Sequence, residues 1–226
     1  MRSPLSARPP ELAAMGRFYD ATWGRLFAAV YDRGLKGTEE AGLQEMRRET
    51  LRAARGRTID LGAGTGANLP LYPDAVTELV LAEPDPHMSK QLRQKLAQSD
   101  RSAELVEAPA EQLPFEDSSF DTAVFTLVLC TVPNPEAALA EAARILKPGG
   151  KLLFVEHVRA NDPGLARWQD RLEKPWRFIG DGCHCNRDTV ASIEASPLTV
   201  ERVERGRLPK APPLVRPLAR GTAVLR

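Results

Sequence analysis

The chain has 226 residues, of which 42% are hydrophobic and 27% charged, and its net charge is +1. This length fits one large domain with a substantial core. The nearly balanced charge creates no overall field that would attract nucleic acid or an anionic membrane. The longest mostly apolar run, at 123–132, is shorter than the roughly 18 residues of a membrane span. Three cysteines are odd in number and too few for a disulfide framework, so we expect a cytoplasmic protein.

The N-terminal segment divides into a tail and a helical region. Residues 1–10 are rich in Pro and Arg and have no apolar core behind them, which predicts a disordered tail and not a signal peptide. Over 11–55 we expect a helical lid that lies across the domain and covers its ligand. A role at a membrane surface stays open for the same segment. The apolar stripe at helical spacing consists of Leu12, Met15, Tyr19, Trp23, Phe27 and Tyr31.

From about residue 57, short β-rich runs alternate with amphipathic helical stretches. This alternation predicts an α/β fold with a seven-stranded, mostly parallel, Rossmann-like sheet and helices on both faces. The last two strands flank a Pro-rich stretch and are expected to form an antiparallel C-terminal edge. The domain would cover 56–226, with a substrate-covering insertion at about 158–186. The expected strands are 57–61, 77–83, 103–107, 122–129, 151–157, 198–207 and 217–226.

Local signals mark two helices between the strands. Asp85 can cap a helix that has Pro86 at its first position. Asn134-Pro135 opens another helix in the same way. The stretch 147–150, Lys-Pro-Gly-Gly, is expected to end that second helix. A short helix is also expected near 187–195, after the insertion.

The first strand ends in the glycine loop at 60–66, Asp-Leu-Gly-Ala-Gly-Thr-Gly. In an open α/β sheet, ligands bind beyond the carboxyl ends of the strands, where glycines let the backbone approach them. The glycines are two apart, unlike the G-x-G-x-x-G of dinucleotide binders, which disfavours a nicotinamide oxidoreductase. Glu83 ends strand two and can accept hydrogen bonds from ribose hydroxyls, Glu111 could accept an adenine amino group, and Asp60 could bind an ammonium group.

Seven segments carry a resemblance to the class I S-adenosylmethionine (SAM)-dependent methyltransferases, from about residue 17 to the C-terminus. The chain resembles the type 11, ubiquinone-biosynthesis-like subgroup. Within it, the chain is most similar to the mammalian methyltransferase-like thiol S-methyltransferases, which associate with membranes. The combination of TLVLC, EHV and DGC is the most specific part. The segments are Gly64-Thr65-Gly66-Ala67-Asn68, Tyr72-Pro73, Thr126-Leu127-Val128-Leu129-Cys130-Thr131-Val132, Glu156-His157-Val158, Trp168-Gln169 to Pro175-Trp176, Asp181-Gly182-Cys183 and Arg216-Pro217.

The resemblance implies SAM as the cofactor and a small molecule as the methyl acceptor. The hydrophobic N-terminal anchor of the mammalian proteins has no counterpart here, so we expect no transmembrane segment, with peripheral membrane contact left open. Ala63 stands where cysteine is common in the family. The residues expected to bind the cofactor are Asp60, Gly62, Ala63, Gly64, Gly66, Asn68, Glu83, Pro84, Met88, Ala110, Glu111 and Thr126.

The residues after strand four indicate the kind of acceptor. Methylases of amides and adenines resemble one another in placing [Asn/Asp]-Pro-Pro-[Tyr/Phe] there, whereas this chain has TLVLC and no acidic residue. An apolar or easily ionised acceptor fits better, and a thiol, with a pKa near ~8.5, is already partly ionised at neutral pH. Two alternatives stay open: a C- or O-methyltransferase of a quinone, polyketide or lipid-like acceptor, and a catalytically silent SAM-binding partner protein.

The candidate catalytic residue is His157, at the carboxyl end of strand five, as a general base or orienting group. A hydrogen-bonded structural histidine is the competing interpretation. His184 and Arg187 are second choices, in a segment expected to cover the substrate. Cys183, His184 and Cys185 together with Cys130 suggest a zinc site, but no metal is expected. Structural zinc normally has paired C-x2-4-C spacings, and Cys-x-Cys with an adjoining His gives poor tetrahedral reach. The apolar lining of the acceptor pocket is expected to come from Trp168, Trp176 and Phe178.

Overall fold

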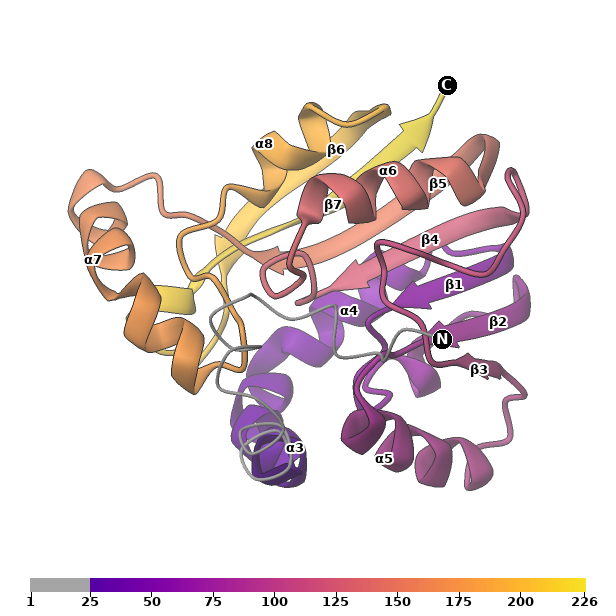
Figure 1. Cartoon of the computed structure of the whole chain (residues 1–226), viewed down its shortest axis with the longest axis horizontal. Coiled ribbons are helices and arrows are strands. Elements are labelled where there is room, and N and C mark those ends of the chain that lie inside the picture. Colours follow the sequence, from indigo (N-terminus) through magenta and orange to yellow (C-terminus); the bar gives the residue numbers. More distant parts are fainter. Residues whose placement is uncertain (1–24) are drawn as a thin grey trace.

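A computed structural model describes residues 25–226 of the chain (Figure 1). The predicted tail at 1–10 lies outside the described residues, as do the first four residues of the predicted N-terminal stripe. Phe27 and Tyr31 lie inside the described residues, on one helix, and their two aromatic rings pack with their centroids 5.5 Å apart. Within 25–226, no helix combines the length and apolar character needed to cross a bilayer.

The seven strands form one sheet in the order β3-β2-β1-β4-β5-β7-β6. The first five strands run parallel, and β7 pairs antiparallel with both β5 and β6. This confirms the predicted mostly parallel sheet with an antiparallel C-terminal edge. The strands are β1 (Gly56–Leu61), β2 (Val76–Ala82), β3 (Glu104–Val106), β4 (Phe120–Thr126), β5 (Leu146–His157), β6 (Leu198–Arg207) and β7 (Pro217–Leu225).

Helices cover both faces of the sheet, with α6 and α8 on one side and α4 and α5 on the other (Figure 1). Two further helices, α3 and α7, lie beside the edge at which the parallel strands end. The helices are α3 (Arg25–Thr38), α4 (Gln44–Leu51), α5 (Pro86–Ala97), α6 (Pro135–Ile145), α7 (Pro163–Ile179) and α8 (Thr189–Glu194), with a π-helical turn at Glu39–Leu43 and 3₁₀ turns at Leu69–Leu71 and Pro213–Val215.

The central strands are buried on both faces, as expected for parallel strands between helix layers. Phe120 and Phe125 of β4 and Phe154 of β5 have no exposed surface. The pairing of β1 with β4 sets Leu61 opposite Phe125. This packing fixes the carboxyl ends of β1, β4 and β5 side by side, and the loops that follow these strands therefore meet at one edge.

The predicted helix starts are confirmed by their caps. The carboxylate of Asp85 accepts hydrogen bonds from two backbone N–H groups at the start of α5, and Asn134 accepts one at the start of α6. The α7 helix begins in the same way at Asp162, whose carboxylate accepts the N–H of Leu165 at 2.7 Å. Each cap satisfies donors that the first helical turn leaves free.

Two boundaries differ from the sequence prediction. The α6 helix ends at Ile145, and the Lys-Pro-Gly-Gly stretch belongs to β5, which begins at once at Leu146. The pairing of β4 with β5 jumps here from Leu146 to Lys151, so the stretch forms an irregularity within β5, and regular pairing resumes at Lys151. Strand β4 ends at Thr126 and not at the predicted residue 129, because Leu127 turns the chain with a φ of +59°.

Candidate active site

Three glycines turn the chain after β1. Gly62, Gly64 and Gly66 all have positive φ values, between +56° and +85°, which strain any residue with a side chain. A Cβ at Gly62 would lie 2.7 Å from the methyl carbons of Val128, and one at Gly66 would lie 2.7 Å from Leu92. A Cβ at Gly64 would meet no atom nearer than 4.0 Å. The outer two glycines therefore permit packing, and the middle one leaves room for a ligand.

Asp60 lies behind this loop in a buried polar network. The amide nitrogen of Asn68 lies 3.0 Å from Oδ2 of Asp60 and 2.9 Å from the hydroxyl of Thr126. The guanidinium of Arg47, on α4, donates to Oδ1 of Asn68 at 3.0 Å. Burial raises the pKa of Asp60 to about 6, although the hydrogen bond from Asn68 opposes the shift. These four side chains fix the base of the glycine loop.

Glu83 follows β2 and joins the second strand to the glycine loop. Its Oε2 accepts the N–H of Gly64 at 2.7 Å, and its Oε1 accepts the N–H of Asp85 at 2.8 Å. Only 6% of the residue is exposed. Burial raises the pKa of its carboxyl to about 7, against the two backbone hydrogen bonds that favour the charged form. Glu83 also lines the cavity described next, so its carboxylate is available to ligand hydroxyl groups.

A cavity of about 710 Å³ extends along the carboxyl edge of the sheet. This volume lies within the roughly 300–1,000 Å³ of small-molecule sites. The predicted cofactor residues fall into two groups, those that line the cavity and those that do not. The second group supports the loop from behind and consists of Asp60, Ala63, Gly66, Asn68 and Thr126. The ones that line the cavity are Gly62, Gly64, Glu83, Pro84, Met88, Ala110 and Glu111.

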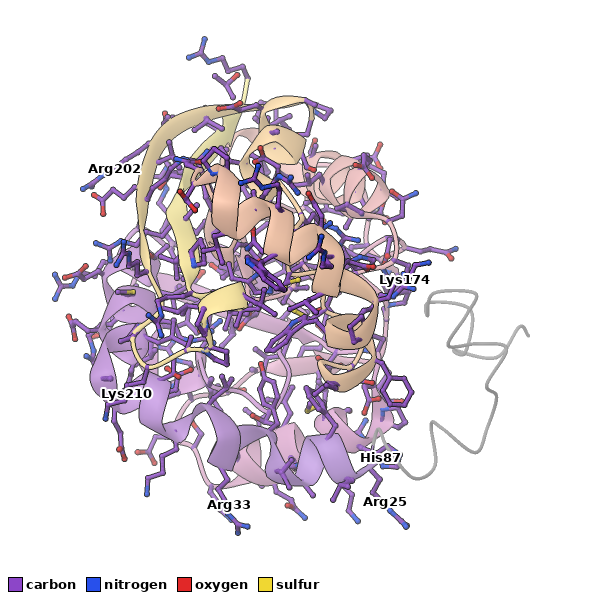
Figure 2. All side chains as sticks on the ribbon, turned by 90° about the vertical axis from the view of Figure 1, so that its left-hand side faces the viewer. Arg25, Arg33, His87, Lys174, Arg202 and Lys210 are labelled. Atoms are coloured by element: carbon purple, nitrogen blue, oxygen red, sulfur yellow. The ribbon has the colours of Figure 1, made fainter. Side chains whose placement is uncertain are left out.

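The α3 helix forms the wall of the cavity opposite the glycine loop. Figure 2 looks onto this side, where α3 and α7 lie across the edge of the sheet and Arg25 and Arg33 point away from the protein. Asp32 holds α3 in place, because its carboxylate accepts hydrogen bonds from Thr65 in the loop and from Lys95 of α5, the latter at 2.6 Å. The α3 residues that line the cavity are Phe27, Val30, Tyr31, Gly34, Leu35 and Thr38.

The other end of the cavity is bounded by the loops after β4 and α7. Leu127 and Asp181 line it, and both are non-glycine residues with positive φ. Such conformations are costly and gather at functional sites, where the surroundings enforce them. Glu156 enforces the first, because its buried carboxylate accepts the N–H groups of Val128 at 2.9 Å and Leu129 at 3.1 Å. The shape of this end therefore depends on β5.

His157 meets two cysteines at this end of the cavity. Its Nε2 lies 2.9 Å from Sγ of Cys183, and the three side chains of Cys130, His157 and Cys183 hold their polar atoms within 4.8 Å of one another. The indole N–H of Trp176 also donates to Cys183, at 3.3 Å. All four residues line the cavity. The sequence prediction did not place Cys130 or Cys183 next to His157.

The electrostatic environment favours a charged His157. Burial alone would lower the pKa of its imidazole, but the adjacent Cys130 and the carboxylate of Glu156 outweigh burial and raise it. The pKa of Cys130 is raised well above its usual range by its contact with Cys183 and by burial.

The second-choice catalytic residues lie elsewhere. His184 pairs through Nδ1 with Glu173 at 2.8 Å, and Arg187 donates to the backbone carbonyls of Leu129 and Val132. Neither lines the cavity. Burial lowers the pKa of His184 and that of Arg187. In the structure Arg187 supports the loop after β4, and His184 contacts α7.

The aromatic lining was only partly as expected. Trp176 lines the cavity, whereas Trp168 is 53% exposed and Phe178 is 44% exposed, and neither contributes to the wall. The helical phase of α7 explains this, because a helix presents only one stripe to the cavity. The segment at 208–215 supplies wall residues that its Pro-rich composition gave no reason to single out, among them Leu208, Ala211 and Val215.

The chain matches the family model for a methyltransferase domain over residues 59–154. This match runs from within β1 to within β5 and includes the glycine loop and Glu83. Together with the relatives described next, two of which are more than 30% identical and covered to 69%, this match shows that the chain belongs to the class I SAM-dependent methyltransferases, and SAM is the cofactor of this family.

Three relatives place it more closely. Thiol S-methyltransferase TMT1B of Rattus norvegicus is 39% identical over 65% of this chain and 61% of the relative. Thiol S-methyltransferase TMT1A of Homo sapiens is 34% identical over 74% of this chain and 69% of the relative. Demethylmenaquinone methyltransferase of Clavibacter sepedonicus is 33% identical over 77% of this chain and 69% of the relative. The match to TMT1B thus leaves more than a third of that relative uncovered.

Solved structures agree with the fold. A SAM-dependent methyltransferase from Thermotoga maritima superposes with a TM-score of 0.64 over 89% of this chain and 97% of that structure, at 21% sequence identity. This likeness supports the arrangement of strands and helices and says nothing about the acceptor.

Proposed function

We propose that this protein transfers the methyl group of SAM to the sulfur of a small thiol. The observation that carries the proposal is the meeting of His157 with Cys130 and Cys183 in the cavity wall, at the opposite end from Glu83. Sulfur and imidazole groups in an otherwise apolar surrounding suit a soft, ionisable acceptor. The two thiol S-methyltransferases among the relatives support the same choice.

The cofactor would bind with its adenosine toward Glu83 and Glu111. The carboxylate of Glu83 accepts hydrogen bonds from the ribose hydroxyls of SAM. Gly64, which has no side chain, lets the methionine moiety of SAM pass close to the backbone. The network of Asp60 and Asn68 holds the loop and places negative charge near the ammonium group. We propose that α3 acts as the lid over this arrangement, since its side chains line the cavity and Asp32 clasps the glycine loop.

The reaction is an in-line displacement. A lone pair of the thiolate forms the new carbon–sulfur bond to the methyl group as the bond from that carbon to the sulfonium breaks, which yields a thioether and S-adenosylhomocysteine. The protein aligns the two sulfur atoms and excludes water. His157 is proposed to orient the acceptor sulfur, because it lies in the cavity wall beside Cys130 and Cys183.

Labelled SAM and a panel of alkyl thiols, phenols, quinones and amines test the proposal. We expect label to pass to thiols and to no other class. The variant His157→Gln should lower kcat while leaving the dissociation constant of SAM within about threefold, and Trp168→Phe, at an exposed position outside the cavity, is the matched control. Transfer to quinones in place of thiols would refute the proposal, and unchanged turnover of His157→Gln would remove that residue from the mechanism.

A second candidate is C-methylation of a quinone-like ring. It is favoured by the demethylmenaquinone methyltransferase among the relatives and by the many apolar residues that line the cavity. It predicts label in quinols and none in thiols. A cytoplasmic location is part of the main proposal, because Cys130, Cys183 and Cys185 are all free thiols, which a reducing compartment preserves.

A further inference from the structure

Three soft ligand groups from three separate elements converge on the cavity. Cys130 follows β4, His157 ends β5 and Cys183 follows α7, and their Sγ, nitrogen and Sγ atoms all lie within 4.8 Å of one another. Cys130 and His157 are at most 4% exposed. The three residues fall within TLVLC, EHV and DGC, the segments that carry the most specific part of the sequence resemblance.

These separations match the size of a tetrahedral zinc site. Zinc binds cysteine sulfur at about 2.3 Å and histidine nitrogen at about 2.0–2.1 Å, which places the ligand atoms about 3.5–3.8 Å apart around a tetrahedron. Nε2 of His157 and Sγ of Cys183 are 2.9 Å apart, which is shorter than this range, and all three ligand atoms lie within 4.8 Å of one another. Small side-chain rotations are therefore enough to receive the ion.

The neighbouring cysteine and histidine do not belong to the group. Cys185 is fully buried and its Sγ lies 3.5 Å from the carbonyl oxygen of Gln169, while His184 is paired with Glu173. The ligand set considered from the sequence was Cys183, His184 and Cys185 with Cys130, and it did not include His157. The fold forms a different ligand set, in which Cys183 is the only contribution from residues 183–185.

We propose that Cys130, His157 and Cys183 bind a zinc ion whose fourth coordination position faces the cavity and takes the sulfur of the acceptor thiol. Three protein ligands with one open position are the pattern of catalytic zinc sites, and two cysteines with one histidine are a known set. The choice of a thiol as the fourth ligand rests on the proposed function. His157 then acts as a ligand that orients the acceptor through the metal, and not as its general base.

The ion would supply the thiolate that the displacement needs. A thiol that coordinates zinc loses its proton outright, and the proton passes to water. The bound sulfur then forms its bond to the methyl carbon, the sulfonium of SAM leaves as S-adenosylhomocysteine, and the neutral thioether dissociates from the metal. No oxidant or reductant takes part. Cys130 and Cys183 stay bound to the ion and are not methylated.

Cobalt(II) binding to the reduced, metal-free protein tests the site without methyl transfer. We expect one equivalent of cobalt, with the intense visible bands of a tetrahedral ion and sulfur-to-cobalt charge transfer. Addition of a small alkyl thiol should intensify the charge-transfer band. The variants Cys130→Ser and Cys183→Ser should weaken zinc binding by more than the roughly 10–100-fold that loss of an outer-shell partner costs. Cys185→Ser is the matched control and should bind like the original chain.

The outcomes separate this inference from the proposed function. Absence of stoichiometric cobalt binding, or equal binding by all three cysteine variants, overturns the zinc site. Spectra that do not respond to thiol overturn the open position. Thiol methylation at an unchanged rate in chelator-treated protein also refutes the inference while leaving the proposed function standing. Cobalt and thiol binding without any transfer to thiols would support the site and refute the proposed function. A thermal melt of each variant checks that it is folded.

Discussion

Glu83 makes ligand binding depend on pH in a way that the structure quantifies. Its carboxyl is almost fully buried and has a pKa of about 7, so close to half of the ligand-free protein carries a neutral Glu83 at pH 7. Hydrogen bonds from ribose hydroxyls are stronger when the acceptor is the charged carboxylate. If only the ionised form binds, the apparent dissociation constant scales with one plus the ratio of protonated to ionised carboxyl. Between pH 8 and pH 6 this factor rises about tenfold.

The ligand for this test is 5′-methylthioadenosine, which has the adenosine of SAM and no amino acid. Neither the ammonium group nor its interaction with Asp60 then contributes to the pH profile. Calorimetric titrations at pH 6, 7 and 8 should show affinity falling as the pH falls. Glu83→Gln should remove the pH dependence and weaken binding at pH 8 by about 10–150-fold, because a hydrogen bond to a charged group contributes roughly 1.5–3 kcal/mol. A flat profile for the original chain would refute this reasoning.

The same carboxyl should make the ligand-free fold less stable at high pH. Its pKa is raised from 4.5 to about 7 in the folded protein, so the folded state holds this proton more tightly than the unfolded chain. The resulting stabilisation is complete below about pH 4.5 and is lost as the pH rises through 7, at a cost of about 3 kcal/mol. In urea denaturation, Glu83→Gln should therefore gain stability relative to the original chain between pH 4.5 and pH 8. A constant difference over this range would contradict the burial of the charge.

Three further substitutions test the supporting structure. Gly64→Ala should cost only about 1 kcal/mol of stability yet weaken SAM binding at least about tenfold. Gly66→Ala should mainly lower the melting temperature, because its Cβ would lie 2.7 Å from a neighbour. The reverse pattern would refute this assignment of binding to Gly64 and packing to Gly66. Arg47→Met should destabilise the protein by about 3–5 kcal/mol in urea, against less than about 0.5 kcal/mol for the exposed control Lys36→Met. Gln169→Leu should cost about 1–3 kcal/mol or more, because the buried amide accepts one backbone N–H at 2.8 Å and donates to two backbone carbonyls, and a neutral effect would show that these groups find other partners.

The sheet could be predicted from sequence because its signals are local. Alternating apolar runs give the strands, and caps such as Asp85 and Asn134 mark the helices within a few residues. The cofactor loop was found for the same reason, since its glycines and Glu83 follow adjacent strands. The early end of β4 at Thr126 could not be foreseen, because Glu156, on the neighbouring strand, takes the backbone N–H groups that would have continued it.

The acceptor end was predictable only in part. Cys130 follows β4 and His157 ends the adjacent strand β5, so their proximity could have been inferred from the predicted sheet order. Cys183 follows a helix whose course depends on long-range contacts, including those of Gln169 with the chain at 158–160 and at Leu214. No periodic pattern in the sequence predicts such contacts. The buried position of Arg47 has the same origin, because an arginine on an amphipathic helix usually faces solvent.

The contact between Gly62 and Val128 limits how this protein can change its acceptor. The methyl groups of Val128 occupy the space that a side chain at Gly62 would need, so the donor side and the acceptor side share one packed boundary. A larger or smaller residue at Val128 would alter the cofactor loop together with the acceptor pocket. New specificities are therefore more accessible through α7 and the chain at 208–215, which border the cavity away from that loop. Divergence of substrate range in such an enzyme should be concentrated in these peripheral elements, while the centre of the sheet stays constant.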